Sequence, residues 1–323
     1  MDRPRFLDSS DEDSHSSGAK FVVDCDAITN SHPTTAGWLV SVTALKIIPR
    51  HKAVDMNNKK ILEAMFHNQK RVVVKVADAT EALHNEWAAY QSLSSKKING
   101  ILKYHCFFTC NDNINRFLTD QPSVCNGPGD STQVLIMEYV NAPSMKHYPW
   151  WDKPIDVWRS CVKQVLLTSV EAYLACKFIH GDLHLDNVLV KRTAKRSIKY
   201  KLLNIELMLL QHCTKFMDFE LSSSDKKPIL DLFKDIRVFT NKLYALVGDY
   251  MTLGPLQTMN LQLRDWVEDS NRPTDPRAII DTLFPMIDQV EFLQVRRHGG
   301  SRAASSKKRN KPQISRRGHP FQG

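Results

Sequence analysis

The sequence lacks any long apolar run. No segment reaches the roughly 18 uncharged apolar residues that a membrane-spanning helix requires, and the best candidate, residues 165–179, is interrupted by Glu171 and Lys177. The first fifteen residues are acidic and serine-rich, without the apolar core of a secretory signal. We therefore expect a protein with no membrane partner that lies inside the cell, in the nucleus or the cytoplasm.

A disulfide framework is also missing. The seven cysteines are odd in number and scattered along the chain, which is typical of reduced thiols. Cys106 and Cys110 have the spacing of half a zinc site, but neither a second cysteine pair nor a nearby histidine pair supplies the remaining ligands. We expect buried thiols rather than a metal centre.

Acidic residues are absent from residues 296–323, which carry nine Lys or Arg. This segment holds the whole net charge of +9, since 44 basic side chains less these nine equal the 35 acidic ones. We expect a disordered basic tail there, suited to nuclear import or to an acidic or nucleic-acid partner. The balanced charge of the remainder argues against a plain nucleic-acid-binding module. Residues 1–19, rich in Asp and Ser, predict a second disordered end.

The remaining chain is apolar enough to fold, because 42% of all residues are hydrophobic and 24% are charged. Short β-branched runs dominate its first half and long helical periodicities its second half. The pattern predicts an α+β fold with two lobes, residues 20–140 and 141–295. Strands are predicted over 38–48, 71–77, 101–109, 133–140 and 188–190, and helices over 80–93, 154–178, 228–246 and 276–295. Residues 215–219 form a further apolar segment.

One segment, His180-Gly-Asp-Leu-His-Leu-Asp-Asn187, follows a predicted long helix and precedes a predicted strand. It resembles the catalytic loop of the protein-kinase-like superfamily, H-R-D-L-x-x-x-N, with the same spacing from Asp to Asn. The resemblance implies a bilobal protein-kinase-like fold. It also implies that Asp182 is the catalytic base for the substrate hydroxyl and that Asn187 binds a Mg²⁺ ion on the phosphates of ATP.

A second segment, Met217-Asp-Phe-Glu220, resembles the D-F-G motif of the same superfamily, with glutamate in place of glycine. The resemblance implies that Asp218 is a ligand of the Mg²⁺ ion that bridges the phosphates. Loss of the glycine removes backbone freedom at this point, which disfavours a switch between two D-F conformations.

The segment Val73-Val-Lys75-Val76 resembles the V-A-I-K strand, whose lysine holds the α- and β-phosphates. Its usual partner is a glutamate on the next helix, for which Glu86 is the first candidate and Glu81 the alternative. Asp235 resembles the helix aspartate that braces the catalytic loop.

Residues Glu138 and Val140 correspond to the inter-lobe hinge of the superfamily, whose backbone groups bind adenine. No G-x-G-x-x-G precedes Lys75, and residues 31–37, with a single glycine, are the only candidate for a loop that covers the phosphates. Gly181 replaces the arginine that pairs with a phosphorylated activation loop in many kinases, so we expect no control of that kind. His184 replaces the lysine that is typical of Ser/Thr kinases, and the A-P-E motif is lacking.

These resemblances imply a phosphotransferase that uses ATP and Mg²⁺. The D-L-H…D-F-E-L-S arrangement, with the long segment of residues 191–213 between the two motifs, is similar to haspin-type and other divergent kinases. The compact chain with its degenerate glycine loop is also similar to kinases encoded by large DNA viruses. This favours Ser and Thr hydroxyl groups of a protein substrate. A small-molecule kinase of the aminoglycoside or choline type is the first alternative, because H-G-D occurs there too. A pseudokinase that binds partners without turnover is the second.

Overall fold

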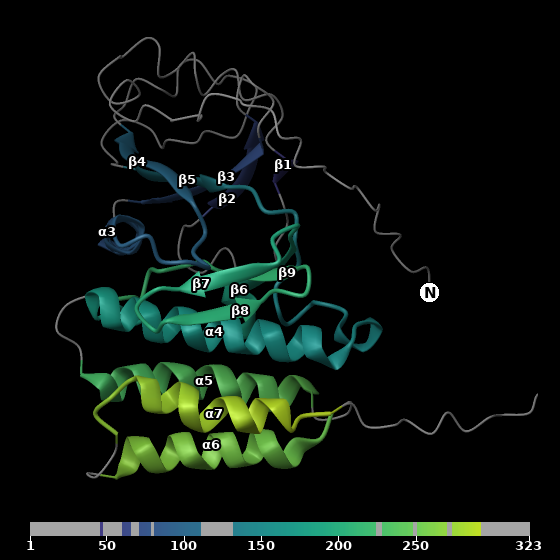
Figure 1. The fold of residues 1–323 in the computed structure, drawn as a ribbon. Helices are drawn as coiled ribbons and strands as arrows, with labels where there is room; N and C mark the ends of the chain where they lie inside the picture. Colours follow the sequence, from purple (N-terminus) through teal and green to yellow (C-terminus); the bar gives the residue numbers. More distant parts are fainter. Residues whose placement is uncertain are drawn as a thin grey trace, which may run out of the picture. The chain divides into compact units, whose positions relative to one another are not determined.

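The computed structural model describes residues 46–47, 60–65, 71–78, 81–110, 132–223, 228–247, 251–269 and 273–291. The chain divides into two compact units, Met1–Phe292 and Leu293–Gly323, and every described residue belongs to the first unit. The described part combines antiparallel sheets with five α-helices (Figure 1). The α+β class predicted from the sequence is therefore confirmed. Both predicted disordered ends and the candidate phosphate loop, residues 31–37, lie outside the described residues.

The largest sheet has five antiparallel strands in the order β1-β2-β3-β5-β4. Its strands are β1 (Lys46–Ile47), β2 (Lys60–Met65), β3 (Arg71–Asp78), β4 (Tyr104–Cys110) and β5 (Thr132–Glu138). Helix α3 (Glu81–Ser95) packs against β4 and β5, and its own side chains Leu83 and Leu93 are buried. Three predicted strands and the predicted helix are present here, whereas β2 was not predicted. Of the predicted strand over 38–48, only residues 46–47 are described.

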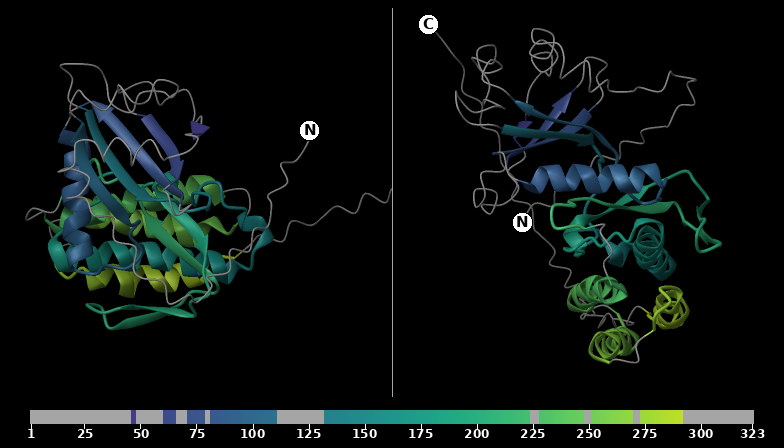
Figure 2. Two further views of the ribbon diagram at one scale, coloured as in Figure 1. Left: turned by 90° about the horizontal axis from the view of Figure 1, so that it is seen from above. Right: turned by 90° about the vertical axis from the view of Figure 1, so that its left-hand side faces the viewer.

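Four further helices form the second half of the described chain. They are α4 (Ile155–Cys176), α5 (Ile229–Val247), α6 (Leu253–Glu268) and α7 (Arg277–Asp288). The helical pattern predicted over 154–178 contains two apolar rows, Val157, Cys161 and Val165 and Val162, Leu166 and Val170, and all six side chains are buried, as expected for a helix that is apolar on several sides. Figure 2 shows these helices end-on and side by side, and α5 packs against both α4 and α6. Among the described residues, no helix has the length and the apolar character needed to cross a bilayer.

Two small hairpin-like sheets lie against α4. Strand β6 (Val188–Arg192) pairs with β9 (His212–Phe216), and β7 (Ser197–Tyr200) pairs with β8 (Ile205–Met208). Short 3₁₀ turns precede α4 and β6, at Trp150–Asp152 and Leu185–Asn187. The sequence did not predict the β7–β8 hairpin, which fills most of the segment between the two motifs.

The position of β9 is fixed by a buried glutamine of α4. The Gln164 side chain donates from Nε2 to the carbonyl oxygen of His212 (3.1 Å), and its Oε1 accepts from the amide of Thr214 (2.9 Å). These bonds satisfy backbone groups on the edge of β9 that faces away from β6, which would otherwise be buried without partners. Strand β9 leads directly to Asp218, so α4 determines where that carboxylate lies.

Backbone hydrogen bonds join β9 to the segment between α3 and β4. The amide of Leu102 donates to the oxygen of Phe216 (2.9 Å), and the amide of Phe216 donates to the oxygen of Gly100 (2.7 Å). Gly100 has φ +73°, and a Cβ there would lie 2.7 Å from Thr168 Oγ1. Glycine at this position therefore lets the segment that bonds to β9 also pack closely on α4.

Candidate functional site

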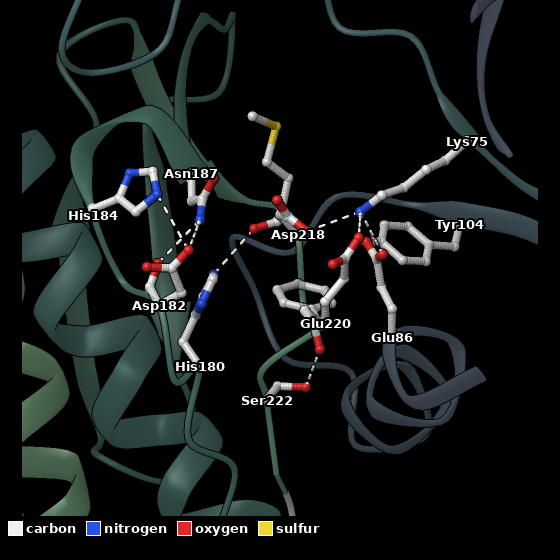
Figure 3. A network of polar contacts seen from close by, with 12 residues as sticks. Lys75, Glu86, Tyr104, His180, Asp182, His184, Asn187, Asp218, Glu220 and Ser222 are labelled. Atoms are coloured by element: carbon white, nitrogen blue, oxygen red, sulfur yellow. Dashed lines mark hydrogen bonds and ion pairs between the residues drawn. The ribbon is translucent and has the colours of Figure 1, made fainter. Parts of the chain in front are cut away.

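Lys75 lies in the middle of β3 and is only 5% exposed. Its Nζ atom is 2.9 Å from Glu86 Oε2 on α3 and 2.9 Å from Asp218 Oδ1, and it also contacts Glu220 Oε1 (Figure 3). One ammonium group therefore meets three carboxylates from two parts of the chain, α3 and the segment of residues 218–220. Of the two glutamates considered as partners of Lys75, the structure brings Glu86 to it.

The Lys75–Glu86 pair is buried, and its surroundings keep the lysine charged. Burial alone would lower the pKa of Lys75, but attraction to Glu86, Asp218 and Glu220 outweighs it and raises that pKa above its ordinary value. Burial raises the pKa of Glu86, and the attraction of Lys75 opposes this rise. The hydroxyl of Tyr104 donates to Glu86 Oε1 (2.5 Å), and burial raises the pKa of Tyr104 well above 10, so it remains a donor.

Asp218 adopts a left-handed backbone conformation, with φ +66°. Such a φ is uncommon for a residue other than glycine and costs energy. The next residue, Phe219, is fully buried and packs on Tyr104 and His180, with ring centroids 5.6 and 5.4 Å apart. Burial of Phe219 therefore holds the turn that directs the Asp218 carboxylate toward Lys75.

The loop that begins at His180 is held from two sides. The amides of His180 (3.0 Å) and Leu183 (3.3 Å) donate to the carboxylate of Asp235 on α5, which is the brace that the sequence predicted. His180 is buried, and burial lowers its pKa to about 4, so the ring is neutral near pH 7. Its Nε2 lies 3.0 Å from the oxygen of Met217 and, because a carbonyl only accepts, must carry the proton.

The Asp182 carboxylate is fixed by two neighbours, although 44% of its side chain is exposed. Asn187 donates from Nδ2 to the backbone oxygen (3.0 Å) and to Oδ2 (3.3 Å) of Asp182. His184 Nε2 lies 3.3 Å from the same Oδ2. His184 Nδ1 accepts from the amide of Asp186 (3.2 Å), so Nε2 carries a proton and donates to Asp182.

The two predicted motifs meet at one place. The amide of Met217 donates to the oxygen of Asn187 (3.1 Å), so the backbone next to Asp218 contacts the backbone of the loop that carries Asp182 (Figure 3). The structure thus brings together Lys75, Glu86 and Asp218 by direct contact, joins Asp182 to Asn187, and links the two groups through this backbone hydrogen bond.

The predicted hinge residues make other contacts. The amide of Glu138 donates to the oxygen of Lys103 (2.7 Å), and its carboxylate accepts from the amide of Lys103 (2.7 Å) and pairs with Lys215. The carbonyl of Val140 accepts from the amide of Ala142 (2.8 Å). The Glu138 carboxylate therefore ties β5 to β9, and neither hinge residue contacts the Lys75 cluster among the described residues.

The oxygen atoms of the site suit Mg²⁺, which prefers carboxylate and amide oxygens. Asn187 uses Nδ2 as a donor toward Asp182, so its Oδ1 remains an acceptor. Glu86, Asp218 and Glu220 also have ligand atoms within 4.8 Å of one another. Lys75 already contacts all three, so its ammonium group compensates part of their charge, and we assign no separate metal to the three together.

Sequence reasoning missed three contacts of the site. It noted Glu220 only as a replacement for glycine, and it did not single out Tyr104. It treated His184 as a replaced lysine rather than as a donor to Asp182. No protein-family model and no curated protein matches the chain, so a function must be argued from this geometry.

Proposed function

We propose that the chain is a phosphotransferase with a bilobal protein-kinase-like fold, which transfers the γ-phosphoryl group of ATP to Ser or Thr hydroxyl groups of a protein. One observation carries the proposal. A buried Lys75–Glu86 pair contacts Asp218, and the residue before Asp218 is hydrogen-bonded to Asn187 of the pair Asp182–Asn187. Phosphoryl transfer needs a positioned nucleophile and neutralisation of phosphate charge, and these side chains supply both.

Each side chain has a role in this proposal. Lys75 binds the α- and β-phosphates, and Glu86 orients its ammonium group. Asp182, the catalytic base, positions the acceptor hydroxyl and takes its proton while Asn187 and His184 fix the carboxylate. Asn187 and Asp218 hold Mg²⁺, which neutralises phosphate charge when bound. Glu138 and Val140 would bind adenine through backbone groups other than the Glu138 amide and the Val140 carbonyl, which bond within the protein.

A binding protein without turnover is the second candidate, and Glu220 favours it. Its carboxylate forms an ion pair with the ammonium group of Lys75, and the α- and β-phosphates of ATP need the same ammonium group. Under our proposal this contact is exchanged for phosphate when ATP binds. In a pseudokinase Glu220 would remain in place, and ATP would bind weakly or not at all.

The test is transfer of labelled γ-phosphate from Mg²⁺–ATP to a mixture of basic and acidic proteins. Asp182→Asn should abolish labelling while Mg²⁺–ATP binding and the melting temperature stay unchanged. Asp218→Asn should remove the Mg²⁺ dependence of ATP binding. Asp281→Asn, an exposed aspartate of α7, is the matched control and should label as the wild type does.

The outcomes separate the candidates. Label on Ser or Thr that Asp182→Asn abolishes supports a protein kinase. Tight Mg²⁺–ATP binding without protein labelling, together with transfer to aminoglycosides or choline, contradicts the protein acceptor. Absence of ATP binding contradicts the whole proposal and leaves the binding protein.

A further inference from the structure

Basic side chains gather on one small region beside α4. Residues 191–204 carry six Lys or Arg and no Asp or Glu, and they run from the end of β6 through β7 to the turn before β8 (Figure 1). All six basic side chains belong to exposed residues. We refer to this set as the basic hairpin surface: Lys191, Arg192, Lys195, Arg196, Lys199 and Lys201.

Three of these charges have no nearby counter-charge: within the described part of the chain, no carboxylate lies within 4 Å of the charged groups of Lys191, Lys195 or Arg196. Lys199, whose side chain is 72% exposed, has a counter-charge in Glu206 at 3.7 Å. Burial raises the pKa of Cys213, and Lys215, Lys191 and Lys195 oppose that rise, so these three cations act on the same small region. An uncompensated group of like charges attracts anions.

The backbone that carries these side chains is firmly attached to the rest of the fold. The Asn99 side chain donates to the oxygen of Lys199 (2.7 Å), and Arg277 donates to the oxygen of Leu202 (3.0 Å). The buried Glu171 carboxylate accepts from the amide of Leu202 (3.2 Å). Because the scaffold is already ordered, a ligand would pay little conformational entropy to engage it.

The strand geometry directs Lys199 outward, and further basic residues adjoin the strand. Tyr200 is buried and Ile198 is half-buried, so the alternation of a strand turns Lys199 to the opposite side. Strand β7 (Ser197–Tyr200) spans about 13 Å at about 3.3 Å per residue, and the exposed residues Arg196 and Lys201 adjoin its two ends. This length is similar to that of about four phosphates of one nucleic-acid strand at about 3.4 Å each along the axis.

We propose that the basic hairpin surface binds the phosphate backbone of a nucleic acid. Two observations favour this ligand over an acidic protein. Closely spaced exposed basic residues in and beside a strand suit a regular phosphate backbone, and residues 296–323 add nine basic side chains without acidic ones, which would reinforce contacts that are independent of base sequence. Residues 1–295 have as many acidic as basic side chains in total, although residues 191–204 contain only basic ones. The inference goes beyond phosphotransfer and does not depend on it.

The test compares two full-length variants that lose the same three charges. Lys191→Gln/Lys195→Gln/Arg196→Gln alters the basic hairpin surface. Lys234→Gln/Lys242→Gln/Arg264→Gln alters exposed positions of α5 and α6 and is the matched control. Binding to a random-sequence DNA duplex of about 20 base pairs is measured by fluorescence anisotropy over a range of salt concentrations.

We expect the hairpin variant to bind this duplex at least about 10-fold more weakly than the control at about 0.1 M salt. Its slope of log K against log salt should be smaller in magnitude by about 2–3, because each lost phosphate contact removes about 0.9. Equal affinities of the two triple variants would overturn the proposal. Equally tight binding of polyglutamate of the same charge, lost in the same variant, would overturn it in favour of an acidic protein partner.

Melting temperatures show whether both triple variants are folded. Should the hairpin variant melt early, the single variant Lys195→Gln replaces it in the comparison. Lys195 is exposed and precedes β7, so its substitution disturbs no buried contact. A loss of about 2–3-fold in DNA affinity is then expected from one contact, and no loss would overturn the proposal.

Discussion

A Cβ atom on Gly181 would lie 2.2 Å from the backbone oxygen of Leu221. The segment that follows Asp218 runs directly beside this glycine, because the amide of Ile179 donates to the oxygen of Ser223 (2.8 Å) and the amide of Ser223 donates back (3.0 Å). Gly181 also has φ +79°. Glycine at this position therefore allows residues 221–223 to pack on the loop that carries Asp182.

Gly181→Ala should destabilise the protein and reduce phosphotransfer. The left-handed conformation alone costs a residue with a side chain about 1–2 kcal/mol, and the clash with Leu221 displaces backbone rather than a flexible side chain. We expect a loss of at least about 2 kcal/mol in the free energy of unfolding, measured by urea denaturation. Gly254→Ala is the control, since nothing lies within 4 Å of its added Cβ. A Gly181→Ala protein as stable as the wild type would contradict this account.

Lys75→Met should abolish Mg²⁺–ATP binding and also destabilise the fold. It leaves the buried Glu86 carboxylate without its cation, and removal of one partner of a buried pair costs about 3–5 kcal/mol. The double variant Lys75→Met/Glu86→Gln should recover much of the stability but none of the ATP binding. Urea denaturation and nucleotide titration measure the two effects separately. Recovery of ATP binding in the double variant would show that Lys75 does not hold the phosphates.

Glu220→Gln should strengthen Mg²⁺–ATP binding. The substitution keeps the size of the side chain but removes the charge that competes with phosphate for Lys75. We expect the dissociation constant to fall by about 3–10-fold, which corresponds to about 1 kcal/mol. Glu268→Gln, on the exposed side of α6, is the control and should leave the dissociation constant of Mg²⁺–ATP unchanged. Weaker binding would instead mean that Glu220 takes part in binding the nucleotide or its metal.

Stability should fall in acid because of His180. Its pKa is about 4 in the folded protein, against an ordinary value near 6.5 when unfolded. Below about pH 6.5 the unfolded chain binds a proton that the folded one does not, so this contribution is complete above that pH and is lost as the pH falls to about 4. The difference between the two pKa values corresponds to about 3 kcal/mol.

The measurement is the free energy of unfolding of the wild type and of His180→Phe between about pH 7.5 and pH 4. The difference between the two proteins should shrink by about 3 kcal/mol over this range. Burial raises the pKa of Asp235 to about 7, and this opposes the trend, but Asp235 is present in both proteins and cancels in the difference. A constant difference would mean that His180 titrates near its ordinary pKa.

Most of the regular elements could be predicted because their signals are local. The long apolar rows of α4 and the β-branched residues of β3 identify a helix and a strand without reference to the rest of the chain. The hairpin β7–β8 was missed because its strands have only four residues each. Its inward residues, such as Tyr200, are buried only through contacts with α4, which no local pattern reveals.

The amino-acid sequence is enough to identify the polar side chains of the candidate site and their spacing along the chain. Asp182 and Asn187 are five residues apart, so one loop brings them together. Only the tertiary structure decided which carboxylates meet Lys75, because Asp218 lies 143 residues away and reaches it through β9, held on α4 by Gln164. Burial then decided the charge states: attraction of three carboxylates keeps Lys75 charged, whereas desolvation keeps His180 neutral. Such effects depend on distance in space, which spacing along the chain does not give.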